Sequence, residues 1–572
     1  MESSRRERTV SSALWAAYGD ILGFPTELVD MAGVQRRLGD KTIRLPKAWK
    51  RLVGGRSGTW IELAAGSYSD DTQLRLSTSR CIRADGYFDV EAFAKVELPV
   101  WLSYALGAGR GSKVGASSLS QRSANWFTNF FDQRDVVYTA GGGNGAAMRI
   151  QPHVWAAHDL GNPASYLPDV IQNSICTHGH PRGIAGSVIH AVALAHILKH
   201  GEIPPPSDWK MFGSFISVAT EYIEENADLS TFWLPTWNIR TGMQFAEEME
   251  RVRFEWERDV LLVEEILNSV SDRSYEKLVD ALGGRSATER GSGIKCALIS
   301  LSAAWLYRTD EPDFALIKIA NFLGSDTDTI GTMTGALLGA INIDLHPKGE
   351  IQDREYIVRE AERMVAISEE RAKTSFTYPD LLDWTPPKSQ ADAVGRIGDN
   401  IFVVGLGYAA EKESSHNILR SDSAWQLLEL SFGQTILCKR RIELPVIKGV
   451  ANIGYIRERE KNNSKALKNS RNEGEASDRQ GSIWRESEKS RNEDSVATIK
   501  RQEHPNVKNV SLNELTDLAI RSGFQEDQIG RDLLDLADHP NGLELAIAYA
   551  AVIVKARMAR LKRESGEKKL PN

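Results

Sequence analysis

The chain has 572 residues, an apolar fraction of 41% and a formal net charge of −7. This length allows several domains and at least one large hydrophobic core. The acidic balance excludes the strongly basic composition typical of proteins that live on nucleic acid, although it allows local basic patches. The composition therefore does not exclude a nucleic acid as a binding partner.

The cysteines and the apolar runs bear on the compartment. The four cysteines are far apart and form no CxxC pair: Cys81, Cys176, Cys296 and Cys438. This spacing argues against a disulfide framework or a structural zinc site and favours buried thiols. Residues 1–9 are charged and lack the apolar core of a signal peptide. No run reaches the roughly 20 apolar residues that would span a bilayer. We therefore expect a cytoplasmic protein without membrane contact.

Residues 10–385 are predicted to form one large, mainly α-helical domain. Apolar residues recur at helical spacing in several segments. These segments are Val10–Leu22, Thr72–Ala84, Gly183–His200, Val260–Ser269 and Gly293–Tyr307. Small residues are frequent in them, which favours close helix–helix contacts, and strand-like alternation is scarce. We expect the polar and glycine-rich motifs on loops between these helices.

A change in composition near residues 378–388 predicts a boundary, because prolines at 379, 386 and 387 cannot lie inside helices. Short runs with β-branched or aromatic side chains follow, at Ile401–Val404, Trp425–Leu430 and Gln434–Leu437. They predict a small β or α+β element over residues 390–456.

The last part of the chain divides into a charged segment and a helical one. Residues 457–507 are rich in Lys, Arg, Glu, Asn and Ser, and cannot bury enough surface to offset their ordering entropy. We predict a disordered linker there. Residues 510–565 regain helical periodicity, and Ser511 with Glu514 has the spacing of a capping box. We expect a small helical module that contacts a partner or forms oligomers.

Two acidic clusters stand out, Ser69-Asp70-Asp71-Thr72 and Ser325-Asp326-Thr327-Asp328-Thr329. One such cluster alone is well explained as a helix cap, because Ser, Thr and Asp accept hydrogen bonds from orphan amides. Capping needs a single oxygen, however, and adjacent carboxylates repel unless a cation or a proton relieves them. Two hard divalent cations, Mg²⁺ or Mn²⁺, would relieve both clusters and could activate water.

Five stretches carry a resemblance to a known family. They are Ala16–Asp20 with Gly23 and Glu27, Tyr68–Thr72, Gly143–Arg149, Thr177–Pro181 and Gly324–Thr329. In this order they resemble the ADP-ribosylglycohydrolase family, which includes the dinitrogenase reductase-activating glycohydrolases. The resemblance spans residues 10–345, and nothing after Pro386 takes part in it.

The resemblance implies an orthogonal all-α fold with two Mg²⁺ or Mn²⁺ ions at one end of a cleft. It draws the metal ligands from the two acidic clusters: Ser69, Asp70 and Asp71 from the first, and Asp326, Asp328 and Thr329 from the second. Glu27 matches the family acid near the metals, a candidate for contact with substrate or water. The expected catalytic residues are the acids Glu27, Asp70, Asp71 and Asp326.

The glycine-rich loop at residues 143–149 resembles the family segment that wraps the diphosphate and ribose. Its glycines allow a ligand to approach the backbone closely. The expected substrate contacts are Gly143, Asn144, Gly145, Met148 and His180. Arg149 could pair with a phosphate or with a core carboxylate, and the sequence does not choose between them. His178 and His180 would be odd ligands in a hard-oxygen site, so we expect them to shape the substrate site or to pack.

A second glycine motif, Val403–Ala410, mimics a GxGxxA dinucleotide fingerprint. The helix and second strand that this fingerprint requires do not follow it, because residues 411–415 are polar. We expect a turn or bulge here and no nucleotide cofactor.

Together these features predict a metal-dependent glycosidase that removes ADP-ribose from a protein or another acceptor. Two enzymatic alternatives are hydrolysis of a free ADP-ribose-type nucleotide and of ADP-ribosylated nucleic acid. A third alternative is a binding module with weak catalysis. The segment Arg110–Phe131, with Trp126, Phe127 and Phe130, is a candidate for reshaping the cleft and so for deciding among substrates.

Overall fold

The computed structural model describes residues 4–55, 58–121, 124–133, 135–381, 384–412, 418–420, 423–447, 453–457, 512–538 and 542–567. The chain divides into two compact units, Met1–Glu458 and Arg459–Asn572. The predicted boundary near residues 378–388 does not separate these units, because the β element belongs to the first of them.

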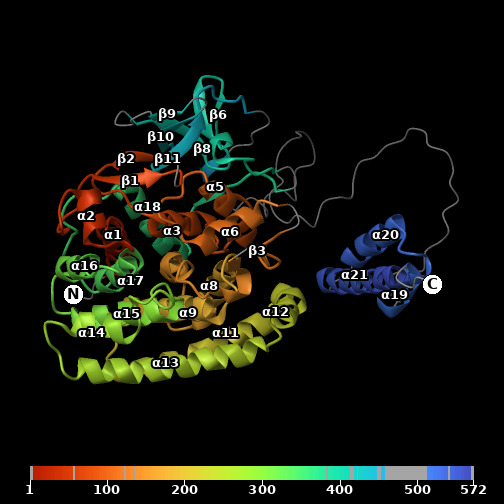
Figure 1. Ribbon diagram of the computed structural model, residues 1–572, viewed down its shortest axis with the longest axis horizontal. Helices are drawn as coiled ribbons and strands as arrows, with labels where there is room; N and C mark the ends of the chain where they lie inside the picture. Colours follow the sequence, from red (N-terminus) through yellow and green to blue (C-terminus); the bar gives the residue numbers. More distant parts are fainter. Residues whose placement is uncertain are drawn as a thin grey trace, which may run out of the picture. The chain divides into compact units, whose positions relative to one another are not determined.

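Helices make up most of the first unit (Figure 1). The α-helices are α1 (Arg5–Gly23), α2 (Met31–Leu38), α3 (Asp70–Cys81), α4 (Val90–Ala92), α5 (Leu98–Trp101), α6 (Arg110–Leu119), α7 (Gln151–Ala156), α8 (Leu167–Ile175), α9 (Pro181–His200), α10 (Pro206–Phe212), α11 (Ser214–Glu225), α12 (Leu234–Thr241), α13 (Phe245–Leu267), α14 (Ser274–Ala281), α15 (Gly293–Leu306), α16 (Pro312–Ala320), α17 (Thr327–Gly339) and α18 (Arg354–Ser368). Short 3₁₀ or π turns are η1 (Phe93–Glu97), η2 (Tyr138–Ala140), η3 (Ala147–Arg149), η4 (Pro163–Ser165), η5 (Leu229–Trp233) and η6 (Gln390–Asp392). The mainly α-helical fold expected from the sequence is confirmed.

Helices α1 and α17 pack backbone to backbone in the centre of this unit. Their small residues make this possible: a Cβ added to Gly19 would lie 2.1 Å from the carbonyl oxygen of Gly331. A Cβ on Gly335 would lie 2.2 Å from the carbonyl oxygen of Trp15. Because Glu27 follows α1 and Asp326 immediately precedes α17, this helix pair brings two predicted site residues together.

The close contact of α1 and α17 makes Gly335→Ala a destabilising change. The added methyl group would meet backbone atoms that cannot move aside, so we expect a loss of about 1–3 kcal/mol of unfolding free energy. Gly530→Ala in α20 (Glu526–Ala537) is the control, because nothing lies within 4 Å of the added Cβ. Denaturant unfolding followed by circular dichroism measures both variants, and an unchanged Gly335→Ala midpoint would contradict this packing.

Among the described helices, α9 alone is long and apolar enough to cross a membrane. An 18-residue window of this 20-residue helix has a mean hydropathy of 1.3, and 89% of the window is buried inside the fold. It packs against α8 and α15. Its apolar character is therefore explained by its place in the core.

The strands gather mainly on one side of the helical body, next to α5 and α18 (Figure 1). They are β1 (Trp49–Val53), β2 (Thr59–Leu63), β3 (Asp132–Gln133), β4 (Val136–Val137), β5 (Thr374–Thr377), β6 (Val394–Ile397), β7 (Asn400–Val403), β8 (Gly407–Glu411), β9 (Ile418–Arg420), β10 (Ser423–Leu430), β11 (Thr435–Arg441) and β12 (Gly454–Arg457). The largest sheet runs β11-β10-β8-β7-β6, with β9 beside β10, and its strand pairs are antiparallel. The predicted β element is thus present.

The apparent dinucleotide fingerprint is a β-hairpin. Strands β7 and β8 pair directly, Val403 with Gly407, and no helix intervenes. Gly405 has φ +83°, and a Cβ there would lie within 3.0 Å of side-chain atoms of Val96 and Val100. The glycine therefore serves a tight turn that packs on the helical body, as expected for a structural motif.

The second unit contains α19 (Leu512–Arg521), α20 and α21 (Gly542–Glu567). Its core is formed by Leu515, Ala519, Phe524, Leu536, Tyr549 and Ile553. The Tyr549 hydroxyl donates to Asp532 Oδ2 at 2.6 Å. The predicted linker at residues 457–507 lies outside the described residues except for Arg457, which ends β12, and the capping residue Ser511 also lies outside them. The partner or oligomer role of this unit stays a prediction.

Candidate metal centre

The first acidic cluster begins α3. Ser69 is the N-cap, and its Oγ accepts a hydrogen bond from the Asp71 amide at 3.2 Å. Asp20 of α1 fixes the same turn: Oδ1 accepts from the Ser69 amide at 2.9 Å, and Oδ2 accepts from the Thr72 hydroxyl at 2.6 Å. Asp70 Oδ1 accepts from the Ala108 amide at 2.7 Å. Ser69 therefore does cap α3, but this cap does not use Oδ1 of Asp71, which has no hydrogen-bond partner among the described residues.

The second acidic cluster begins α17, with Asp326 as the N-cap. Asp328 Oδ1 accepts from the Thr329 amide at 2.9 Å. The Thr327 hydroxyl donates to the Gly23 carbonyl at 2.9 Å and lies 3.1 Å from the Thr26 hydroxyl. These bonds tie the start of α17 to the turn that carries Glu27.

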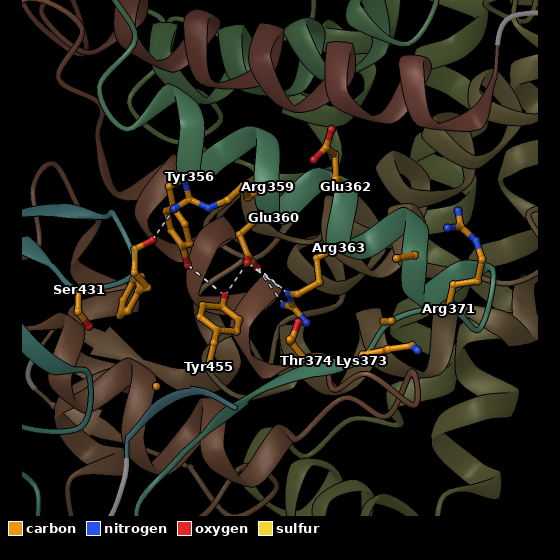
Figure 2. A pocket seen from close by; sticks show the side chains of 14 residues that line it. Tyr356, Arg359, Glu360, Glu362, Arg363, Arg371, Lys373, Thr374, Ser431 and Tyr455 are labelled. Carbon is orange, nitrogen blue, oxygen red and sulfur yellow. Dashed lines mark hydrogen bonds and ion pairs between the residues drawn. The ribbon is translucent and has the colours of Figure 1, made fainter. Parts of the chain in front are cut away.

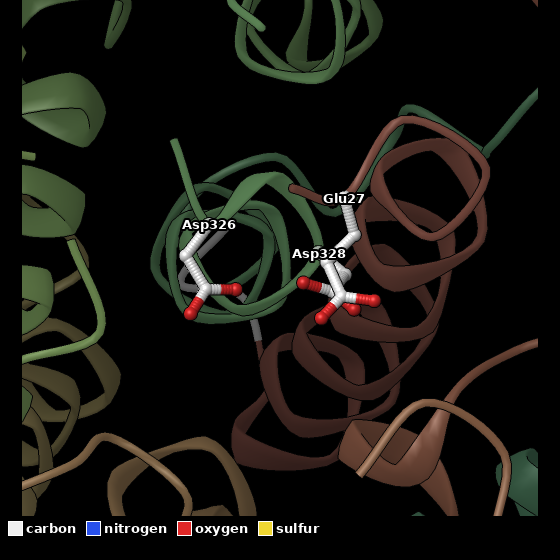
Figure 3. Close-up of side chains that lie close together, drawn as sticks. All are labelled: Glu27, Asp326 and Asp328. Atoms are coloured by element: carbon white, nitrogen blue, oxygen red, sulfur yellow. The ribbon is translucent and has the colours of Figure 1, made fainter. Parts of the chain in front are cut away.

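The tertiary fold brings the two clusters and Glu27 together. Carboxylate oxygens of Glu27, Asp326 and Asp328 lie within 4.8 Å of one another (Figure 3). The Thr329 hydroxyl lies 3.5 Å from Asp71 Oδ2, which links this group to the first cluster. Asp71 Oδ1 is buried and has no hydrogen-bond partner among the described residues. Oxygen ligands therefore converge from both ends of the sequence match.

Burial gives these carboxyl groups a strong preference for protons. It raises the pKa of Glu27 to about 8, with a further contribution from the charge of Asp326. It also raises the pKa of Asp70 to about 7, and the charge of Asp20 adds to this rise. The pKa values of Asp71 and Asp328 lie well above their usual range for the same reason. Such crowded acids need either protons or a cation.

The donor set fits a hard divalent cation. Carboxylate and hydroxyl oxygens are the ligands that Mg²⁺ and Mn²⁺ prefer, and no sulfur or imidazole is needed. Asp71 Oδ1 is buried, and no hydrogen bond from the described residues offsets the cost of removing this oxygen from water. A bound cation would supply the missing partner.

Two arginines near Glu27 were not anticipated from the sequence. Arg37 of α2 donates to the carbonyl oxygens of Pro25 at 3.0 Å and Glu27 at 3.3 Å. Arg51 of β1 lies with its guanidinium 4.3 Å from the centre of the Phe24 ring, and its charge lowers the pKa of Glu27. Asp20 was likewise not predicted to be a site residue, although it belongs to the Ala16–Asp20 motif. Only the folded chain shows that these three residues surround the cluster.

A cavity of about 390 Å³ adjoins the acids. Predicted site residues that line it are Glu27, Asp70, Asp71, Gly143, Asn144, Gly145, Met148, Asp326, Asp328 and Thr329. Asn144 has a second role, because its amide donates to Asp326 Oδ2 at 2.9 Å. It therefore orients a candidate ligand as well as lining the cavity.

The two histidines of the Thr177–Pro181 motif separate in the structure. His178 lines the cavity, and burial lowers its pKa to about 3, so it is neutral. His180, the expected substrate contact, is not among the residues that line the cavity. Its Nδ1 accepts from the Arg182 amide at 3.1 Å and caps α9. The sequence does not distinguish these two histidines. The structure does, because His180 caps α9 whereas His178 lines the cavity.

Arg149 takes neither of the two roles considered for it. Its Nε donates to Asn173 Oδ1 at 2.7 Å, and its Nη2 donates to the Thr177 hydroxyl at 2.9 Å. The guanidinium also lies 5.2 Å from the centre of the Phe93 ring. It is fully buried and holds the Asn144 loop against α8 rather than binding a phosphate or a carboxylate.

The segment Arg110–Phe131 contributes four residues to the lining of the cavity: Arg110, Gly111, Ser112 and Phe131. Phe131 lines it together with Tyr138. Trp126 and Phe127 are buried, and the Phe127 ring lies 6.0 Å from Phe232 of η5. Phe130 packs 5.0 Å from Tyr138. Most of this segment therefore supports the wall of the cavity from behind.

A larger cavity of about 760 Å³ lies away from the acids, beside α18, β5 and β12 (Figure 2). Two of its charged groups, Arg363 and Glu360, form an ion pair with each other. Arg363 donates to Glu360 Oε2 at 2.9 Å, and the Tyr455 hydroxyl donates to Glu360 Oε1 at 2.6 Å. Arg359 donates to the Phe432 carbonyl. Size alone does not make this the active site.

Comparisons with known proteins agree with the geometry. ADP-ribosyl-[dinitrogen reductase] glycohydrolase of Rhodospirillum rubrum is 27% identical over 196 residues, which are 34% of this chain and 59% of that protein. An uncharacterized protein of Archaeoglobus fulgidus is 24% identical over 357 residues, 61% of this chain and 93% of that one. The uncharacterized protein YegU of Escherichia coli is 24% identical over 345 residues, 59% and 88% of the two chains.

The matched segment thus spans less than two thirds of the Rhodospirillum protein, but most of the other two relatives. The sequence profile of the ADP-ribosylglycohydrolase family matches residues 1–373. This range holds both acidic clusters, Glu27 and the glycine-rich loop. The chain therefore belongs to the ADP-ribosylglycohydrolase family.

Proposed function

We propose that the chain is a metal-dependent glycosidase that releases ADP-ribose from an ADP-ribosylated protein or another acceptor. The observation that carries the proposal is the meeting of Glu27, Asp326 and Asp328 with the Asp71 end of α3 at one cavity. A relative named for the dinitrogen reductase glycohydrolase reaction supports a protein acceptor. Free ADP-ribose-type nucleotides and ADP-ribosylated nucleic acid are the alternative substrates.

Two cations are proposed, held by the oxygens of the two clusters. Ser69, Asp70 and Asp71 would contribute from α3, and Asp326, Asp328 and Thr329 from α17. When bound, Mg²⁺ or Mn²⁺ would supply Lewis-acid polarisation and fix the ribose hydroxyls. The four buried cysteines fit the cytoplasmic location that we also propose.

The reaction breaks the bond from the anomeric carbon to the acceptor and forms a bond to a water oxygen. Its transition state has oxocarbenium character, so the carboxylates around the cavity would stabilise the developing positive charge. Glu27 lines the cavity beside Asp326 and Asp328, where its carboxyl group could exchange a proton with water. Asn144 keeps Asp326 oriented. The glycines at 143 and 145 let the substrate approach the backbone of the loop closely.

The test is an assay with purified protein, with Mg²⁺, with Mn²⁺ and with chelator. The substrates are Arg-, Ser- and nucleic-acid-linked ADP-ribose, and mass spectrometry identifies the product. We expect free ADP-ribose from at least one linkage with metal and none with chelator. Equal release in chelator would contradict the metal proposal. Tight ADP-ribose binding without release from any substrate would favour the binding-module alternative.

A further inference from the structure

The helix that carries Asp70 and Asp71 is held at both ends by one turn of the β element. This turn comprises residues 431–434 between β10 and β11, together with Thr435 at the start of β11, and is called the buttress turn below. It lies beyond residue 373, where the family match ends. The contact at the C-terminal end of α3 is direct and buried, and the contact before the helix passes through one carboxylate.

The contact before α3 passes through Asp353, which precedes α18. The Tyr68 hydroxyl donates to Asp353 Oδ2 at 2.6 Å, and the Thr435 amide donates to the same oxygen at 2.7 Å. Tyr68 is 1% exposed and immediately precedes Ser69. One carboxylate oxygen therefore joins the metal-cluster loop to the buttress turn.

Asp353 holds a backbone conformation that a non-glycine residue rarely adopts, with φ +59°. Such conformations persist only where surrounding contacts stabilise them, and they are frequent at functional sites. Its neighbour Gln352 adds to the link: the amide donates to the Gly66 carbonyl at 3.0 Å, and Nε2 donates to the Thr435 carbonyl at 3.2 Å. The Ser67 hydroxyl donates to Gln352 Oε1 at 3.2 Å.

The contact at the far end of α3 is made by Arg80. Its Nη1 donates to Gln434 Oε1 at 2.6 Å. Its guanidinium lies 5.3 Å from the centre of the Phe432 ring. Both Arg80 and Gln434 are fully buried. The buttress turn thus contacts the C-terminal end of α3 and is also linked to the loop before the helix.

We infer that the buttress turn positions the Ser69–Asp71 ligands for metal, with Tyr68 and Asp353 as positioning residues. This inference rests on the proposed metal-dependent function. It gives the β element, which lies outside the family match, a defined part in the activity. Loss of the Tyr68 contact should weaken metal binding without touching any ligand.

The test compares Tyr68→Phe with Tyr455→Phe. Each change removes one hydroxyl that donates a part-buried hydrogen bond to a carboxylate at 2.6 Å, but the partner of Tyr455 is Glu360, in the network of Figure 2. We expect Tyr68→Phe to weaken Mn²⁺ binding by about tenfold, the lower end of the effect of removing groups that orient metal ligands. Tyr455→Phe should bind Mn²⁺ like the wild type. Calorimetric titration of the full chain measures both.

A second measurement separates this inference from the proposed function. Amide hydrogen exchange of the metal-free protein should rise in residues 66–72 for Tyr68→Phe and not for Tyr455→Phe. Gln434→Ala, which removes the Arg80 contact, should raise exchange at the C-terminal end of α3. Unchanged exchange in residues 66–72 overturns the inference whatever the titration shows. A wild type that binds no Mn²⁺ contradicts the proposed function, while the exchange data still decide the role of the buttress turn.

Discussion

Replacing Asp326 with asparagine is expected to lower the release of ADP-ribose by about 10²–10³-fold, as seen when a key electrostatic group is removed from an active site. The Asp326 carboxylate lies where Glu27 and Asp328 converge, and Asn144 holds it in place. The amide of asparagine has nearly the same shape but no charge for a cation. Steady-state kinetics at saturating Mg²⁺ or Mn²⁺ measure the loss.

A measurement of folding stability distinguishes this loss of activity from misfolding. The direction in which stability changes with pH follows from the raised pKa values. The pKa of Glu27 is raised to about 8 and that of Asp70 to about 7. The folded, metal-free protein therefore holds protons more tightly than the unfolded chain, whose carboxyl pKa values are about 4, and loses stability as the pH rises from about 4 to 8. The charge of Asp326 contributes to the raised pKa of Glu27. Asp326→Asn should therefore melt at or above the wild-type temperature at pH 8 without metal.

A matched control is Asp169→Asn in α8. Burial raises the pKa of Asp169 to about 7, but this residue does not line the cavity. We expect full turnover from this variant. Near-normal turnover by Asp326→Asn, or a loss shared by Asp169→Asn, would refute the assignment of Asp326.

Glu97→Gln is expected to cost about 3–5 kcal/mol of unfolding free energy, the usual effect of leaving one partner of a buried ion pair alone. Glu97 and Arg80 are both fully buried. Glu97 accepts from Arg80 Nε at 2.7 Å and Nη2 at 2.8 Å, and from the Tyr378 hydroxyl at 2.7 Å. A neutral glutamine leaves the Arg80 charge without its counter-ion in the core. Denaturant unfolding measures the loss.

Two comparisons make the Glu97 prediction specific. Glu311→Gln removes one partner of the exposed Lys348–Glu311 pair and should change stability by less than about 1 kcal/mol. Adding Arg80→Met to Glu97→Gln should recover part of the loss, because no unpaired charge then remains. If Glu97→Gln is as stable as Glu311→Gln, the buried pair does not hold α3 in the way described.

The sequence by itself determined the helical class, and it predicted that acidic residues form the site. Helical periodicity located α1, α3, α9, α15 and the C-terminal part of α13, because these segments bury one or more apolar faces in the core. The paired aspartates indicated a cation site because capping cannot explain adjacent charges. The hairpin at residues 400–411 was also predictable, since a dinucleotide fingerprint requires a helix that the polar residues after it do not form.

The tertiary structure alone decided which residues meet. Arg37 of α2 and Arg51 of β1 both lie near Glu27, and no local sequence pattern predicts a contact between such separate elements. His178 and His180 are only two positions apart, yet one lines the cavity and the other caps α9. The support of α3 by the buttress turn depends on hydrogen bonds between residues hundreds of positions apart. Periodicity and motif spacing report local backbone geometry and ligand type, whereas contacts such as these arise only when distant segments pack.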